Sequence, residues 1–373
     1  MSISVIDTPA ACGSPLFHAS LKTQRSDFIV DEVLDIEMEG EGEHLYLHLR
    51  KSGMNTDELA QLLEKAYSVG SKDVGLAGMK DRHAITSQWF SVTTPQGVEL
   101  LEALLADFNT SEKEVLILKS VRHSRKLRHG AHKGNRFVIT LRDVTPTQSE
   151  SYEQLIQSIA LRVASIAQSG FPNYIGPQRF GFGGQNLVRA RQWFKQPKKR
   201  TSRQQRSLWL SAARSAVFNA VCAKRVEAGN WQSLLPGEPA ILDGTRSFFE
   251  PGKNAGEGED AGESSTEELE ARLQAFDIHP SAPWWGRGRT PTSGECATFE
   301  SEILSDFADI CEGLEKAGLS QERRPIRALA RDLEHQWLDN STLQLSFHLS
   351  PGLFATTLLK ELGVCDEPDR RSV

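Results

Sequence analysis

Two segments near opposite ends of the chain carry the same strand pattern, which constrains the fold more than any other feature of the sequence. In RFVITLR at 136–142 and TLQLSFHL at 342–349, apolar residues take every second position. A period of two places these side chains on one face of a β-strand and the polar ones on the other. Sheets with one covered face and one polar face are typically antiparallel. The pattern therefore predicts a mixed, mainly antiparallel sheet.

Further segments alternate between strand and helix patterns. Strand patterns occur at 45–49, 85–92 and 114–120, and helical spacing of apolar residues occurs at 55–67, 100–108 and 155–167. Asn55 and Glu58 have the spacing of a helix capping box, and Gly170 with Pro172 ends the third helix. Together these segments predict an α+β fold. We expect a domain boundary along the helix at 151–169.

Length, hydropathy and cysteine spacing favour a two-domain protein of the cytoplasm. A chain of 373 residues can bury two medium-sized cores. The most apolar helical segment, 207–223, contains Arg214 and is shorter than the about 20 residues of a membrane span, so we expect a buried helix. The first residues lack the apolar core of a signal peptide. Five scattered cysteines without a C-x-x-C pair indicate reduced thiols.

The charge of the chain is unevenly distributed. The net charge is −6, yet the segment 154–226 contains thirteen Lys or Arg residues and no Asp or Glu. Acidic residues gather at 31–43 and 250–270, and we interpret the second of these as a mobile surface loop that leads into a helix near Ser265. An acid-free basic block suits a partner rich in phosphate, although such runs are often only solvated surface.

Aromatic residues are interleaved with these cations. They are Phe171, Tyr174, Phe180, Phe182, Trp193 and Phe194. Aromatic side chains can stack on unpaired bases, but at such spacing they more often belong to a core. Both interpretations stay open at this stage.

Common cofactor and nucleophile motifs are absent from the sequence. There is no G-x-x-x-x-G-K-[ST] loop and no G-x-S-x-G elbow, and GFGG at 181–184 is interpreted as a bend. The histidines at 123, 129 and 132 lie among cations that disfavour a metal ion, and no H-x-E is combined with P-C-x-x-C. The remaining possibilities are an enzyme that acts without a metal ion and a protein that only binds its ligand.

A charged triplet interrupts the segment GLAGMKDRHAITSQWFSV at 75–92. A lone aspartate such as Asp81 is usually a turn residue or a helix cap. Here it lies between a glycine-rich loop and a strand, next to Lys80 and Arg82. Neighbouring cations favour the ionised carboxylate, which could serve as a base or a nucleophile.

The chain resembles the TruD family of tRNA pseudouridine synthases over nearly its whole length. The segments that carry the resemblance are GLAGMKDRHAITSQWFSV, RKLRHGAHKGNRF, PNYIGPQRFGFGGQNL, LSAARSAVFN and PGLFATTLLKEL, preceded by DFIVDE. The resemblance implies a pseudouridine synthase catalytic domain with a mixed, mainly antiparallel sheet at 1–160 and 329–373. It also implies an inserted TruD-specific α/β domain at 161–328.

The resemblance also implies roles for individual residues. Asp81 corresponds to the catalytic aspartate of the family. Residues assigned to the substrate site are Phe28, Asn135 and Phe354, together with the basic Lys22 and Lys80. The basic block, rather than the resemblance, assigns Arg179, Lys198, Lys199 and Arg200 to the RNA backbone.

The implied activity is isomerisation of uridine to pseudouridine at position 13, in the D-stem of tRNA, without a cofactor. The carboxylate of the aspartate would add to C6 of the base, attack C1′ of the ribose, or remove a proton from C2′, and the sequence does not choose among these routes. The implied partner is tRNA, with no membrane and no obligate protein partner, in the cytoplasm. A non-catalytic RNA-binding protein and a metal-dependent RNA nuclease are the alternatives.

Overall fold

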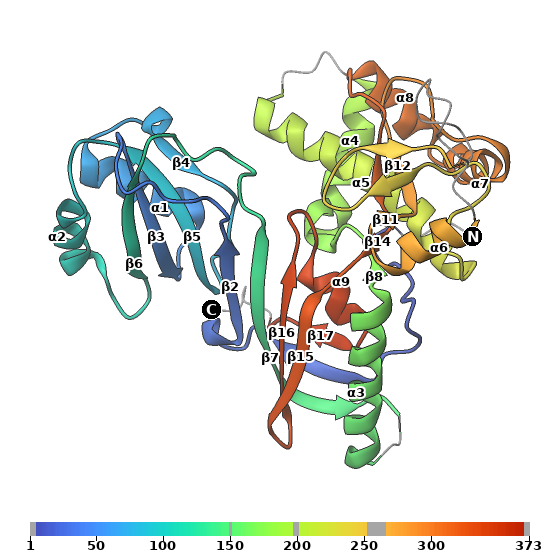
Figure 1. Cartoon of the computed structure of the whole chain (residues 1–373), viewed down its shortest axis with the longest axis horizontal. Helices are drawn as coiled ribbons and strands as arrows, with labels where there is room; N and C mark the ends of the chain where they lie inside the picture. The colour runs from blue at the N-terminus through green and yellow to red at the C-terminus, as the bar shows by residue number, and fades with distance from the viewer. Residues whose placement is uncertain (1–4, 149–150, 197–200, 252–265, 369–373) are drawn as a thin grey trace. The chain divides into compact units, whose positions relative to one another are not determined.

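The computed structural model describes residues 5–148, 151–196, 201–251 and 266–368 (Figure 1). The chain divides into two compact units, which we name by their dominant structure. The strand-rich unit comprises Pro15–Val163, Ala330–Gly352 and Gly363–Val373. The helix-rich unit comprises Met1–Ser14, Ala164–Leu329 and Leu353–Leu362.

One sheet forms the centre of the strand-rich unit. Its strands are β1 (Phe17–Leu21), β2 (Phe28–Val33), β3 (His44–Ser52), β4 (Val74–Leu76), β5 (Ile85–Thr93), β6 (Glu114–His123), β7 (Gly134–Pro146), β15 (Arg331–Asp339), β16 (Thr342–Leu349) and β17 (Val364–Asp366). The main order is β15-β16-β7-β2-β5-β3-β6, with β4 paired to β5 and β1 paired to β7 and β17.

The hydrogen-bonding directions confirm the predicted class of sheet. Among the described strands, β2 and β5 are parallel, as are β1 and β17, and the other pairs are antiparallel. The two segments that first indicated the sheet, in β7 and β16, are hydrogen-bonded neighbours. Their apolar residues share one face because Phe137 lies opposite Phe347 and Ile139 lies opposite Leu345.

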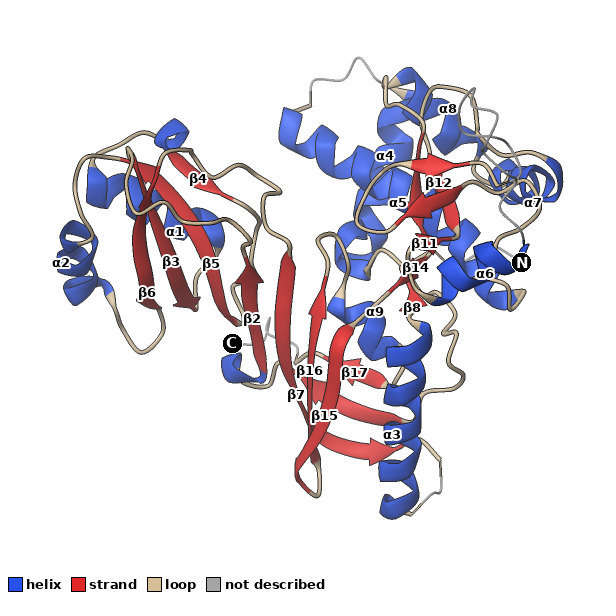
Figure 2. Cartoon of the chain, viewed as in Figure 1, coloured by secondary structure: helices blue, strands red, loops and turns tan. Residues whose placement is uncertain are grey.

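Two helices cover one face of this sheet at β3 and β5. They are α1 (Thr56–Tyr67), which lies beside β3 and β5 in Figure 2, and α2 (Glu99–Phe108), which lies beside β6. Leu45, Leu47 and Leu49 of β3 point into the core that both helices cover. The predicted capping box is confirmed, because the Glu58 N–H donates to Asn55 Oδ1 at 2.8 Å and the Asn55 N–H donates to Glu58 Oε2 at 2.9 Å.

The helix-rich unit is built around one buried helix, α5 (Arg203–Glu227). The other helices are α4 (Gln185–Lys195), α6 (Thr266–Gln274), α7 (Gly294–Ser305), α8 (Ala308–Lys316) and α9 (Ala355–Lys360). The short strands are β8 (Phe171–Pro172), β9 (Ala240–Leu242), β10 (Phe248–Phe249), β11 (Ile278–His279), β12 (Ser281–Trp284), β13 (Glu322–Pro325) and β14 (Arg327–Ala328).

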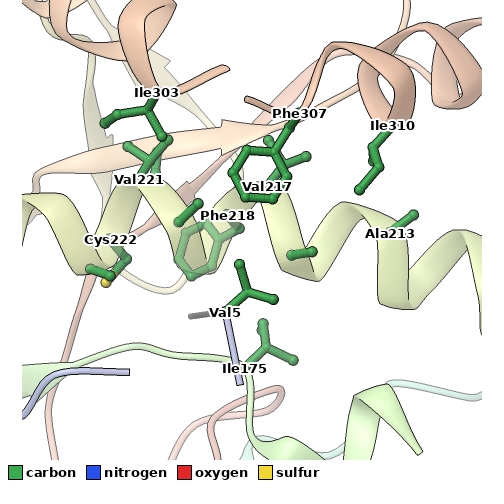
Figure 3. Packing of buried hydrophobic residues seen from close by; sticks show 14 of the residues in the cluster. Val5, Ile175, Ala213, Val217, Phe218, Val221, Cys222, Ile303, Phe307 and Ile310 are labelled. Carbon is green, nitrogen blue, oxygen red and sulfur yellow. The ribbon is translucent and has the colours of Figure 1, made fainter. Parts of the chain in front are cut away.

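The core of this unit surrounds the second half of α5. Figure 3 shows Val217 of α5 beside Phe307 and Ala213 beside Ile310, with Val5 on the opposite side of the helix. The segment 207–223 was predicted to be a buried helix, and its residues from Ala212 onward are buried. Its first turns stay exposed because they carry polar and basic residues. No helix among the described residues is long and apolar enough to cross a membrane.

Several local predictions are confirmed by these bounds. The third predicted helix is α3 (Tyr152–Ser169), which ends at Gly170, a residue with φ 75°. GFGG forms a bend in which Gly181 has φ 70° and Gly183 has φ 56°, values that favour glycine. The helix expected near Ser265 begins at Thr266, whereas the acidic loop before it lies largely outside the described residues.

The division into two units falls inside α3, between Val163 and Ala164, and again between Leu329 and Ala330. The predicted catalytic domain included residues 1–14 and 353–362. In the structure, the described residues of these segments, 5–14 and 353–362, belong to the helix-rich unit.

Candidate active site

The loop that carries Asp81 joins β4 to β5 in the strand-rich unit, and buried side chains hold its backbone. Gln88 Nε2 donates to the carbonyl of Gly78 at 3.1 Å, and the Lys80 N–H donates to Thr56 Oγ1 at 2.8 Å. Thr56 Oγ1 donates in turn to Gln88 Oε1 at 2.9 Å. The side chains of Thr56 and Gln88 are inaccessible to water, so a buried polar network fixes the loop.

Lys51 makes a third side-chain hydrogen bond to the backbone of this loop. Its Nζ donates to the carbonyl of Asp81 and to the carbonyl of Met54, both at 2.8 Å. The residue is only 1% exposed, and burial lowers the pKa of its ammonium from 10.5 to about 8. A buried cation of this kind is costly, and here it ties the backbone of Asp81 to the turn before α1.

The carboxylate of Asp81 has two partners. Lys22 Nζ lies 2.7 Å from Oδ2, and the His83 N–H donates to Oδ1 at 3.0 Å. Burial would raise the pKa of this carboxyl, but the Lys22 ammonium and the His83 N–H outweigh burial and lower the pKa. The side chain is 38% exposed. Asp81 is therefore a charged carboxylate that is held in place and still reachable.

Lys22 connects the carboxylate to an aromatic ring. Its side chain is 10% exposed, and its Nζ also lies 2.9 Å from Glu367 Oε1. Burial would lower the pKa of Lys22, but Asp81 and Glu367 outweigh burial and raise it. The same Nζ lies 4.7 Å from the centroid of the Phe28 ring, a cation–π contact. Lys22 has φ 56°, an uncommon value for a residue other than glycine.

Phe28 is a buried part of the sheet. It begins β2, and its ring meets Phe137 edge to face at 6.1 Å, while Phe137 stacks on Phe347 at 5.3 Å. The next residue, Ile29, pairs with Ile85 at the start of β5, directly after the Asp81 loop. The structure thus brings Asp81, Lys22 and Phe28 together.

Lys80 has a different position from the one that its place in the charged triplet suggests. Its Nζ lies 2.9 Å from Glu32 Oε2, and both side chains are buried. Glu32 Oε1 also accepts a hydrogen bond from the Trp89 N–H at 3.0 Å. The main cation that lowers the pKa of Asp81 is therefore Lys22, which is distant in the sequence, whereas Lys80 points into the fold.

Asn135 lies at the start of β7, between Glu32 of β2 and Leu349 of β16. Its Oδ1 is shielded from water and has no hydrogen-bond donor among the described residues. A buried acceptor without a donor is uncommon, and it fits a ligand that supplies an N–H group.

The remaining assigned residues lie in the helix-rich unit or outside the described residues. Phe354 precedes α9 and lies at the edge of the core of the helix-rich unit. Arg179 lies in a 3-10 turn of that unit, half-buried, and burial lowers the pKa of its guanidinium. Lys198, Lys199 and Arg200 lie outside the described residues.

No group of three or more potential metal-ligating His, Cys, Asp or Glu side chains gathers in the described parts of the chain. The cluster around Asp81 offers one accessible carboxylate, a paired ammonium and an aromatic ring. Such a set suits acid–base or nucleophilic chemistry on a flat organic ring.

Comparison with known proteins decides the family. The family model described as tRNA pseudouridine synthase D (TruD) matches residues 11–186 and 184–362. The chain belongs to the TruD family. It is 41% identical to tRNA pseudouridine synthase D of Methylococcus capsulatus, over 95% of this chain and 94% of that protein. It is 44% identical to that of Nitrosococcus oceani, over 93% and 91% of the two chains.

A solved structure supports the fold of this TruD family member. The crystal structure of a Methanosarcina mazei protein assigned to TruD matches with a TM-score of 0.66 at 20% identity, over 97% of this chain and 95% of that one. At this identity the match bears on the fold alone.

The sequence contains a clue to Lys51, although no motif marks this residue. Leu45, Leu47 and Leu49 alternate toward the core, so Lys51 continues the same face of β3. A lysine at a core-facing position predicts a buried polar contact. Thr56, Gln88 and Glu367 offered no such clue, because their roles depend on residues that are distant in the sequence.

The position of Lys51 has a measurable consequence for stability. Because its pKa is about 8 in the folded protein and near 10.5 when exposed, the unfolded chain binds the extra proton between these pH values. This residue therefore adds stability as the pH rises from 8 to 10.5. In the wild type, Lys51 should raise the free energy of unfolding by up to about 3 kcal/mol over this pH range. We expect this rise to be absent in Lys51→Met.

Urea denaturation at several pH values between 7.5 and 10 measures this effect. Lys119→Met is the matched control, because Lys119 is exposed on the neighbouring strand β6. Equal pH slopes for wild type and Lys51→Met would contradict the assignment of a lowered pKa to Lys51.

Proposed function

We propose that this protein isomerises uridine to pseudouridine in tRNA, at position 13 in the D-stem, with Asp81 as its catalytic residue and without a cofactor. The observation that carries the proposal is the ionised carboxylate of Asp81, paired with Lys22 at 2.7 Å beside the ring of Phe28. Membership of the TruD family and relatives named tRNA pseudouridine synthase D support the same activity.

The reaction explains why these side chains occur together. The C1′–N1 bond of uridine breaks, the base rotates, and a C1′–C5 bond forms, after which C5 loses its proton and N1 carries one. Atoms and charge balance without water or a redox partner. The base must first leave its stack, which costs a few kcal/mol, and an aromatic face such as that of Phe28 offsets part of this cost.

The proposed site has a place for each part of the nucleoside. Asp81 acts on C6, on C1′ or on the C2′ proton, and the paired Lys22 keeps it ionised at neutral pH. Asn135 Oδ1, an acceptor without a donor among the described residues, accepts the N3–H of the uracil ring. Lys80 supports the catalytic loop through its ion pair with Glu32. The assignment of Phe354 to the uridine pocket stays a prediction from the resemblance.

We propose that the catalytic domain is formed by 1–160 and 329–373, and that 161–328 is an insert which contacts tRNA. The acid-free basic block supports this division. Arg179, Lys198, Lys199 and Arg200 are the proposed contacts to the RNA backbone. Because tRNA is the substrate, the proposed place of action is the cytoplasm.

One experiment tests the activity against its alternatives. Unmodified tRNA transcript is incubated with the protein, with and without EDTA, and pseudouridine is mapped by primer extension after carbodiimide treatment. We expect conversion at position 13 under both conditions. Binding without conversion would identify a non-catalytic RNA-binding protein, and EDTA-sensitive cleavage would identify a nuclease.

A further inference from the structure

A second site lies in the helix-rich unit, between the end of α4 and the start of α5. It is a cavity of about 440 Å³, within the range of ligand pockets. We call it the α4–α5 pocket. It is lined by Arg189, Gln192, Trp193, Lys195, Gln196, Thr201, Gln205 and Trp209.

The lining residues have the chemistry of a nucleotide site. Trp193 and Trp209 are half-buried, so each indole is held by the protein and still borders the cavity. Trp209 packs against the core on its inner side. Gln192, Gln196 and Gln205 supply amide groups that can both donate and accept hydrogen bonds at the edge of a base.

The charges around the pocket favour an anion. Arg189 and Lys195 are exposed, and neither forms an ion pair within the described residues. Two acidic residues of the neighbouring helix α8 are already paired, because Asp309 lies 3.0 Å from Arg191 and Glu312 lies 2.5 Å from Lys316. No Asp or Glu occurs between positions 154 and 226. A phosphate therefore meets cations here without a competing carboxylate on α4 or on α5 before its last residue, Glu227, which pairs with Lys224.

One indole is already oriented by a cation. The guanidinium of Arg206 lies 5.0 Å from the centroid of the Trp193 ring, and the Phe194 ring lies 5.7 Å away. Trp209 has no such ring partner among the described residues and is the better stacking surface.

From these observations we propose that the α4–α5 pocket binds an unpaired nucleotide of the RNA substrate, with its base stacked on Trp209 and its phosphates near Arg189 and Lys195. Double-stranded RNA presents phosphates but no free base faces, so two indoles in a cavity favour a single-stranded segment. The inference rests on the proposed function only in taking RNA as the ligand.

The test measures binding by the full-length protein. Hexauridylate, as a single-stranded probe, is titrated while tryptophan fluorescence is followed, and unmodified tRNA is measured by filter binding. Trp209→Leu is expected to weaken both by about tenfold, and Trp209→Phe to retain most of the affinity. The rate of pseudouridine formation at saturating tRNA should stay unchanged while KM rises.

The cations are tested separately, since exposed residues can be changed without disturbing the core. Arg189→Gln with Lys195→Gln should lower the slope of log Kd against log salt for hexauridylate by about 0.7 for each cation. Arg191→Gln is the matched control, because Arg191 is on the same helix but is paired with Asp309. It should leave the slope unchanged.

Two results would overturn the proposal. One is wild-type affinity for hexauridylate and tRNA in a Trp209→Leu protein that melts like the wild type. The other is equal salt slopes for the double variant and Arg191→Gln. A protein that forms no pseudouridine but loses hexauridylate affinity in Trp209→Leu would contradict the proposed activity and support the pocket. A wild-type protein that forms pseudouridine, combined with unchanged hexauridylate affinity in Trp209→Leu, would support the proposed activity and contradict the pocket.

Discussion

Replacing Asp81 by asparagine is expected to lower the single-turnover rate of pseudouridine formation by at least about 1,000-fold, while tRNA affinity changes by less than about tenfold. Asparagine has nearly the same shape, and its side-chain oxygen can still accept the His83 N–H. It lacks the charge and the basicity on which all three routes depend. A residue that only formed a turn would not separate the rate from the affinity in this way.

The control for this prediction is Asp107→Asn, a change of the same kind on the exposed face of α2. It should leave both the rate and the affinity at wild-type values. Thermal melting of each variant excludes unfolding as the cause. A folded Asp81→Asn protein that converts tRNA at the wild-type rate would refute the catalytic assignment.

The second large effect is expected for Lys22→Met, which removes the cation next to Asp81. Lys22 lowers the pKa of Asp81, so the wild-type carboxylate stays ionised when the pH falls below neutrality. Without this cation, burial dominates and the pKa of Asp81 rises. The acidic limb of the pH–rate profile should therefore move to higher pH by about one to two pH units, so that at a given pH on that limb the rate falls by about ten- to a hundredfold.

Two further variants separate charge from structure. Glu367→Gln removes the other carboxylate near Lys22 but leaves the 2.7 Å contact with Asp81, so its acidic limb should stay in place. Lys22→Arg keeps the positive charge and should restore most of the profile. An unshifted acidic limb in Lys22→Met would show that another group controls the ionisation of Asp81.

Asp81 could be identified as a candidate from the order of residues along the chain. A charged triplet between a glycine-rich loop and a strand was unusual enough to single it out, and the order of the motifs indicated its family. The neighbouring cation was misleading, however. Lys80 was expected to support the ionised carboxylate, but its ammonium lies against Glu32, and Lys22 takes the expected place.

For the fold too, the sequence predicted some elements and missed others. Period-two patterns predicted β7 and β16 as strands with one apolar face, and Asn55 with Glu58 marked the start of α1. The strand β15 was not predicted, because LEHQW carries few apolar residues and most of its side chains are at least partly exposed. Its place in the sheet comes from its pairing with β16 rather than from a pattern of its own.

The sequence by itself determined the class of fold, the loop with Asp81 and the basic block, since each depends on residues that are close together along the chain. Only the tertiary structure decided which partners surround the carboxylate. Lys22, directly after β1, and Lys51, in β3, contact Asp81, and Glu367 near the end of the chain pairs with Lys22. Local patterns specify the face on which a side chain lies, whereas strand register and chain closure specify which distant residue it meets.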